Sequence, residues 1–149
     1  KEVRLKGAYY IKYASHETDA NGNITAVHCT YDPESYGGET PDGRKVKGTL
    51  HWVSADNSVE AEVRLYERLF NVPNPSDEEG VSSFADNINP ESLTVLEGCR
   101  IVNSLAGVKP GDTFQFMRQG YFCTDTESSP ELIVFNRTVS LKDSFAKKA

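Results

Sequence analysis

Hydrophobic and polar residues alternate with a period of two along most of this chain, as they do in strands that bury one face. Val3 and Leu5 alternate with charged neighbours, so a strand here would have one apolar side and one charged side. Extended segments are also expected at residues 9–13, 24–31, 46–53, 62–70, 93–96, 113–117, 121–124 and 132–141. The pattern therefore predicts an all-β protein.

Turn residues separate these segments at short intervals. Asn-Gly at 21–22 and Pro-Asp-Gly at 41–43 favour tight turns, because glycine adopts positive φ angles easily. Strands punctuated in this way predict two small antiparallel β-barrels. The Pro-Asn-Pro break at 73–75 places the boundary between them, with residues 1–72 in one barrel and residues 73–149 in the other. Ser76 and Glu79 have capping-box spacing, which predicts a short helix from Asp77 to about Phe84.

The composition adds limits to this picture. The net charge of −6 and pI near 5.1 argue against a protein coated in positive potential, although a local cluster of donors can still bind RNA. The three cysteines form no CxxC pair, so they predict neither a zinc site nor a disulfide framework. No apolar run reaches the roughly 20 residues of a membrane span, and no signal peptide opens the chain. We expect a cytoplasmic protein, and a fragment of a longer one because the chain begins within a strand and without Met.

The sequence offers no catalytic constellation. His28 and Cys29 are adjacent, and neighbours on a strand point to opposite faces, so they cannot form a dyad. No nucleophile elbow, zinc-protease motif or phosphate-cradling loop occurs. We therefore assign no catalytic residue, no metal ligand and no cofactor to this chain by itself.

A set of short segments, in order along nearly the whole chain, resembles the C-terminal region of the glutaminyl-tRNA synthetase family. They include Val-Arg-Leu-Lys-Gly-Ala-Tyr at 3–9, Asp-Gly-Arg-Lys-Val-Lys-Gly at 42–48, His-Trp-Val-Ser at 51–54, Val-Pro-Asn-Pro at 72–75, Phe-Gln-Phe at 114–116, Gly-Tyr-Phe at 120–122 and Phe-Asn-Arg-Thr at 135–138. The resemblance implies two anticodon-binding β-barrels of the ribosomal-protein-like type. Residues 1–72 would be the distal barrel, and residues 73–149 the C-terminal strands of an incomplete proximal barrel.

The resemblance also implies an activity and partners. In that family an N-terminal class I catalytic domain attaches glutamine to its tRNA with ATP and Mg²⁺, and its nucleotide motifs are absent from this chain. The implied partners are the anticodon loop of glutamine tRNA and the protein's own catalytic domain. The implied oligomeric state is a monomer.

Two sites carry over from the resemblance. The family places an Arg-x-Arg pair at Arg4 and Lys6 to meet the first anticodon nucleotide, and a spacing of two would put both on one strand face. Lys6 keeps the charge but lacks the planar guanidinium, so phosphate contact is expected there. The family uses Gln115 and Arg118 on the middle base, a uridine. These two converge only if the strand ends or bulges near Met117, since Phe114 and Phe116 must share the core face.

A basic cluster of Arg44, Lys45 and Lys47 has two interpretations. The three side chains can contact tRNA phosphates, or they can balance Asp42 and Glu39 in a solvated turn, which is the favoured interpretation.

Three alternatives stay open at this point. Glutamyl-tRNA synthetases have similar barrels and a tRNA with the same middle uridine, although Gln115 and Arg118 favour the glutamine enzyme. A stand-alone RNA-binding β-barrel module would begin naturally near Lys1. A secreted carbohydrate-binding module would need glycan at Asn23 or Asn136 and paired cysteines.

Overall fold

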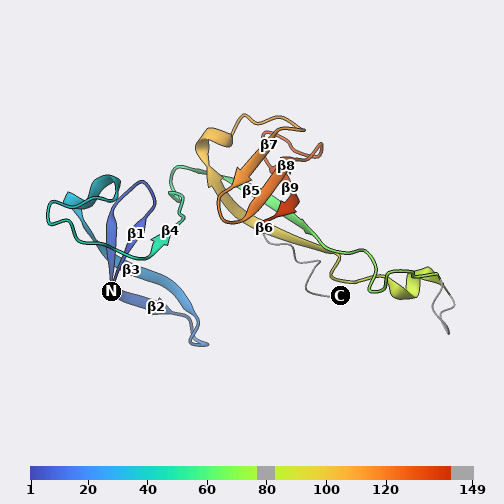
Figure 1. The fold of residues 1–149 in the computed structure, drawn as a ribbon, viewed down its shortest axis with the longest axis horizontal. Coiled ribbons are helices and arrows are strands. Elements are labelled where there is room, and N and C mark those ends of the chain that lie inside the picture. The colour runs from blue at the N-terminus through green and yellow to red at the C-terminus, as the bar shows by residue number, and fades with distance from the viewer. Residues whose placement is uncertain (77–82, 142–149) are drawn as a thin grey trace. The chain divides into compact units, whose positions relative to one another are not determined.

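The computed structural model describes residues 1–76 and 83–141, and strands dominate this part of the chain (Figure 1). The all-β prediction is confirmed. The chain divides into two compact units, residues 1–52 and residues 53–149. This division differs from the expected boundary after residue 72, because the strand that begins at Ser58 pairs with strands near the C-terminus and not with the N-terminal sheet.

Unit 1 contains a four-stranded sheet of order β3-β2-β1-β4. Its strands are β1 (Glu2–Leu5), β2 (Tyr10–Thr18), β3 (Ile24–Asp32) and β4 (Thr49–Leu50). The first three are antiparallel neighbours, whereas β4 lies parallel to β1. The short 3-10 helix η1 (Pro33–Gly38) follows β3, and the Asp32 side chain caps it by accepting from the Glu34 N–H.

Unit 2 contains a five-stranded sheet of order β6-β5-β9-β8-β7. Its strands are β5 (Ser58–Tyr66), β6 (Leu93–Val102), β7 (Thr113–Phe116), β8 (Gly120–Thr124) and β9 (Ile133–Ser140), with the 3-10 helices η2 (Phe84–Asn87) and η3 (Asn103–Leu105). β5 and β9 pair in parallel, and the other neighbours are antiparallel.

The expectation of two small antiparallel β-barrels, the second incomplete, needs correction in its barrel part. Within the described residues each sheet is open, because its two outermost strands do not pair with each other, and each sheet contains one parallel pair. Alternating apolar residues specify strands and their buried face, but they do not specify whether the first and last strands of a sheet meet.

Most of the expected helix at 77–84 lies outside the described residues. The helix η2 begins at Phe84, and its capping box is formed by Ser83 and Asp86. The Ala85 N–H donates to Ser83 Oγ over 3.2 Å, and the Ser83 N–H donates to Asp86 Oδ2 over 3.1 Å. The capping box observed for η2 therefore uses Ser83 and Asp86, which have the same spacing as Ser76 and Glu79.

The core of unit 2 is built around Phe135 on β9, which has no exposed surface. The Phe116 ring lies edge-on to Phe135 with 5.0 Å between ring centroids, and the Phe114 ring does the same at 6.1 Å. Phe116 also stacks on Phe122 of β8 with centroids 4.4 Å apart. These contacts place the alternate residues of β7 and β8 on the core side, so their intervening residues face away from it.

Replacing the central ring tests this arrangement. Phe135→Ala is expected to reduce the free energy of unfolding of unit 2 by about 3–5 kcal/mol, because it removes a fully buried aromatic side chain and leaves a cavity. Val139→Ala on the same strand is the control, since Val139 is 57% exposed and should change stability by less than about 0.5 kcal/mol. Amide hydrogen exchange of β8 and β9 measures both effects. Equal exchange in the two variants would contradict the central role of Phe135.

Candidate nucleic-acid interface

The charged side of the unit 1 sheet is organised around Tyr10. This residue is 2% exposed, its hydroxyl donates to the Gly38 carbonyl over 2.7 Å, and its N–H donates to Ser35 Oγ over 2.7 Å. The guanidinium carbons of Arg4 and Arg44 each lie 5.4 Å from the centre of its ring. Two cations therefore contact one buried aromatic ring, an arrangement that cation–π attraction favours.

Arg44 is bound by three carboxylates. Its Nε donates to Glu2 Oε2 over 3.0 Å, its Nη1 donates to Asp42 Oδ2 over 2.9 Å, and its Nη2 donates to Asp32. Hydrogen bonding to the Arg44 guanidinium is the largest cause that holds the pKa of Asp32 below its usual value. The Thr40 hydroxyl, the Arg44 N–H and the Arg44 guanidinium together lower the pKa of Asp42 to about 2.

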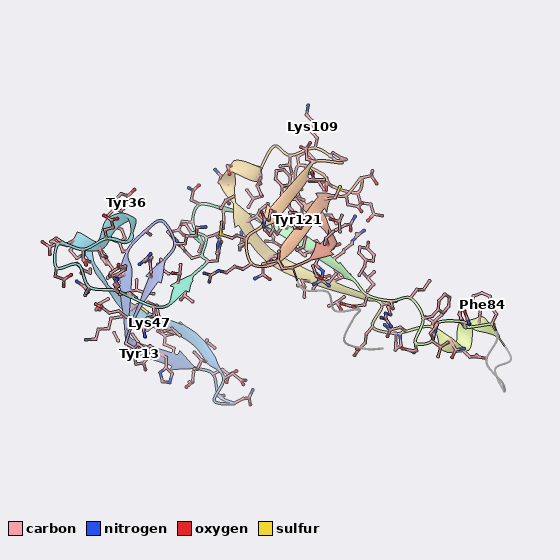
Figure 2. All side chains as sticks on the ribbon, in the orientation of Figure 1. Tyr13, Tyr36, Lys47, Phe84, Lys109 and Tyr121 are labelled. Atoms are coloured by element: carbon pink, nitrogen blue, oxygen red, sulfur yellow. The ribbon has the colours of Figure 1, made fainter. Side chains whose placement is uncertain are left out.

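The three members of the basic cluster differ in their surroundings. Arg44 is half-buried and holds η1 and the following loop onto the sheet, so it supports the structural interpretation, with Glu2 and Asp32 as additional partners. Lys45 and Lys47 are exposed, and Figure 2 shows Lys47 at the surface of unit 1. Sequence reasoning paired this cluster with Asp42 but missed Glu2 and Asp32, because they are distant along the chain.

Arg4 lies on β1, whereas Lys6 lies just beyond the end of this strand. β1 ends at Leu5, and Lys6 lies in a turn closed by the Ala8 N–H, which donates to the Leu5 carbonyl over 3.0 Å. Arg4 is half-buried against Tyr10 and donates to its hydroxyl over 3.4 Å. Lys6 is exposed, and its carbonyl accepts from Trp52 Nε1 over 3.1 Å. The alternation of side chains along β1 stops at Leu5, and Lys6 lies in the following turn together with Gly7, whose φ is 71°.

Gln115 lies where the sequence places it. Phe114 and Phe116 pack against the core of unit 2, and Gln115 between them is exposed on the opposite face of β7. It is paired across the sheet with Tyr121 of β8, which in turn pairs with Val139 of β9. Tyr121 is 45% exposed. The alternation of buried and exposed residues around Phe122 predicts that Tyr121 is exposed, but only the strand register shows that Tyr121 lies opposite Gln115.

Arg118 lies in the turn that joins β7 to β8. The strand ends at Phe116, as the sequence argument required, and the Gln119 N–H donates to the Phe116 carbonyl over 2.8 Å. Arg118 occupies the third position of this β-turn with φ of 65°, where glycine or asparagine is usual. Positive φ is uncommon for an arginine and costs on the order of 1–2 kcal/mol.

The described part of the chain contains neither a metal-ion cluster nor a membrane-spanning helix. Residues 1–76 and 83–141 contain no group of three or more His, Cys, Asp or Glu side chains placed to hold a metal ion. Across the same residues no helix is long and apolar enough to cross a membrane.

Comparison with known proteins gives the family. The model described as "tRNA synthetases class I (E and Q), anti-codon binding domain" matches residues 49–125, more than half of the chain. The chain therefore belongs to the family of anticodon-binding domains of class I tRNA synthetases.

Similar full-length proteins are named glutamine–tRNA ligases. The chain is 57% identical over 148 residues to the one from Vibrio cholerae, which covers 99% of the chain and 26% of the relative. It is 57% identical over 145 residues to the one from Pseudomonas putida, covering 97% of the chain and 25% of the relative. The chain thus spans about a quarter of the length of these curated relatives.

The acid behaviour of the Arg44 cluster can be measured. Asp42 is expected to titrate near pH 2, and Arg44→Gln should raise its pKa towards 3.8 because it removes the guanidinium that donates to the carboxylate, while the N–H of residue 44 and the Thr40 hydroxyl stay in place. The folded state holds the Asp42 proton more weakly than the unfolded state does. The contribution of this carboxylate to the free energy of unfolding is therefore fully present above pH 3.8 and is lost as the pH falls towards 2.

Carbon NMR of the aspartate carboxyl groups across the acid range measures the titration. Lys47→Gln, which removes an exposed cation of the same segment, is the control and should leave the Asp42 midpoint unchanged. An unaltered Asp42 midpoint in Arg44→Gln would show that the cluster does not control this carboxyl group.

Gly120 is expected to be essential to the β7–β8 turn. An added Cβ would lie 2.5 Å from the Val139 carbonyl oxygen, and the φ of 144° is disfavoured for other residues. Gly120→Ala should therefore destabilise the hairpin by more than about 1 kcal/mol, as measured by hydrogen exchange of β7 and β8 amides. Gly107→Ala is the matched control, because nothing lies within 4 Å of its Cβ position. Similar protection in both variants would refute the steric argument.

Proposed function

We propose that this chain is the anticodon-binding portion of a glutamine–tRNA ligase. In this proposal it binds the anticodon loop of glutamine tRNA, and a catalytic domain elsewhere in the full-length protein attaches glutamine in an ATP-dependent reaction. The family of the chain and the names of its relatives support the assignment. ATP and Mg²⁺ would be bound outside this chain, and the full-length protein would act as a cytoplasmic monomer.

The observation that carries the proposal is the left-handed backbone of Arg118 beside the outward-facing Gln115. Backbone strain that a glycine would avoid often marks a functional position. An arginine at the corner of a turn can extend its guanidinium to the edge of an unstacked base, and loops of RNA are read in this way. Gln115 would supply an amide to the same base, the uridine at the middle of the anticodon, with Tyr121 beside it.

Unit 1 would bind the first anticodon nucleotide. Lys6, exposed in the β1–β2 turn, is suited to a backbone phosphate, since an ammonium acts as a point charge. Arg4 would act from a position beside Tyr10, whose hydroxyl accepts from it, in space that a side chain at Gly38 would fill. Lys45 and Lys47 would add phosphate contacts of low specificity, whereas Arg44 is engaged by its carboxylates.

A glutamate–tRNA ligase is the second candidate. The family model covers both the E and the Q enzymes, which is the observation in its favour. The glutamine assignment is preferred because the relatives above 50% identity are named for glutamine. Charging of purified glutamine and glutamate tRNAs by the full-length protein distinguishes the two.

Arg118 should recognise the middle base of the anticodon. In the full-length protein, Arg118→Gly is expected to reduce the preference of kcat/KM for wild-type over middle-base-substituted tRNA by about 5- to 150-fold, the value of one good polar base contact. The same change should leave unit 2 as stable as before or more so, because glycine tolerates the positive φ at this position.

The two readouts separate recognition from folding. Lys47→Ala is the control for a phosphate contact and should affect all tRNAs equally. If Arg118→Gly lowers charging of the wild-type and substituted tRNAs by the same factor, then Arg118 does not read the middle base and the assignment is wrong.

A further inference from the structure

Three tyrosine rings gather at one end of the unit 1 sheet. The centroids of Tyr9 and Tyr31 are 5.1 Å apart with the rings tilted by 62°, and those of Tyr9 and Tyr36 are 5.4 Å apart with a tilt of 51°. Tyr9 is half-buried, whereas Tyr31 is 61% exposed and Tyr36 is 70% exposed. We call these three residues the tyrosine platform. None of them belongs to the sites considered so far.

Tyr9 and Tyr31 lie on the side of the sheet opposite to the Arg44 cluster, and Tyr36 joins them from η1. Tyr10 pairs with Asp32, and both face that cluster. Tyr31 is paired with Ile11, one position along from Tyr10, so its side chain lies on the other face. Tyr9 precedes Tyr10 and shares that face with Tyr31, in agreement with the contact between their rings.

A β-turn presents Tyr36 to solvent. Tyr36 has φ of −56° and ψ of 135°, and Gly37 follows with φ of 78° and ψ of −10°, which are the angles of a type II turn. Tyr36 therefore stands at the corner of a turn that requires glycine at the next position, and Figure 2 shows it projecting from unit 1. Its neighbours Ser35 and Gly38 are buried against Tyr10, so the turn is anchored from below.

The chemistry of the platform fits an unpaired nucleobase. Aromatic rings with exposed faces stack on bases, and each such contact is sequence-tolerant because every base has a π-face. Within the described residues no hydrogen bond is recorded for the three hydroxyl groups, so they can pair with water or with a ligand. Lys6 lies in the turn just before Tyr9, which places a cation at the same end of the sheet for an adjacent phosphate.

We propose that the tyrosine platform stacks on one unpaired base of the bound RNA and that Tyr36 is its principal contact. The proposal rests on the proposed function, since it takes the RNA to be an anticodon loop. It adds a stacking site on unit 1, separate from the readout by Gln115 and Arg118 on unit 2. Stacking here would contribute affinity without selecting a particular base.

Abasic substitution tests the proposal. The full-length protein and its Tyr36→Ala variant are titrated with the anticodon stem-loop of glutamine tRNA, in which each loop nucleotide is replaced in turn by an abasic one. Tyr36→Ala should bind the intact stem-loop about 5- to 150-fold more weakly than the wild type, the range for loss of one stacked base. At one loop position the abasic RNA should weaken the wild type by a similar factor and the variant no further.

Two matched variants complete the experiment. Tyr36→Phe keeps the ring and should retain the affinity of the wild type. Tyr13→Ala removes another exposed tyrosine of unit 1, one whose hydroxyl is hydrogen-bonded to His16 Nδ1 over 2.6 Å, and should also bind as the wild type does. Circular dichroism of all variants confirms that the fold is unchanged.

The outcomes distinguish the two levels of inference. If Tyr36→Ala binds the intact RNA as tightly as the wild type, or weakens every abasic RNA by the same factor, the platform does not stack on a base. In that case discrimination of the middle base can persist and the proposed function still holds. If the wild type fails to bind the stem-loop at all, both the platform and the proposed function are wrong.

Discussion

The packing of Phe114 and Phe116 against the fully buried Phe135 is the constraint on which the candidate base-reading site depends. Two aromatic side chains separated by one residue can both reach the core only if the residue between them faces solvent. This fixes the outward direction of Gln115. Phe116 is both the last of these core residues and the last residue of β7, so Arg118 lies in the turn that follows. The exposed polar groups are thus positioned by the hydrophobic contacts beneath them.

Unit 1 reaches its organisation by another route. Its buried residues are few, and the buried Tyr10 ring, with two guanidinium groups against it, takes the place of a broad apolar core. Arg44 forms ion pairs with a carboxylate of β1, one at the end of β3 and one in the loop before Arg44. A single side chain therefore links three segments of the chain. Partly exposed ion pairs stabilise less than apolar burial, and the carboxylates bound to Arg44 should make the stability of unit 1 depend on acid.

These contacts assign a structural role to Arg44 and leave other basic residues for the proposed RNA contacts. A chain with a net charge of −6 cannot attract RNA with its whole surface, so the cations available for RNA must be the ones that carboxylates do not engage. Arg44 is engaged, whereas Lys45 and Lys47 are exposed. Stacking by aromatic rings is less sensitive to net charge than phosphate contact is, which suits the proposed binding of a single-stranded loop by an acidic domain.

The sequence by itself determined the all-β class, the separation of apolar and charged faces on β1, and the end of the strand before Arg118. Each of these follows from local rules: the two-residue period of strands, and the need of a hairpin to turn where its core residues stop. Tertiary structure decided the rest, because it depends on which distant segments meet. The parallel pairing of β5 with β9 set the boundary at residue 52 and not 72, the partners of Arg44 came from β1 and β3, and the tyrosine platform was assembled from β2, β3 and η1. A period of two gives the direction of a side chain, but only the register between strands decides which side chain it contacts.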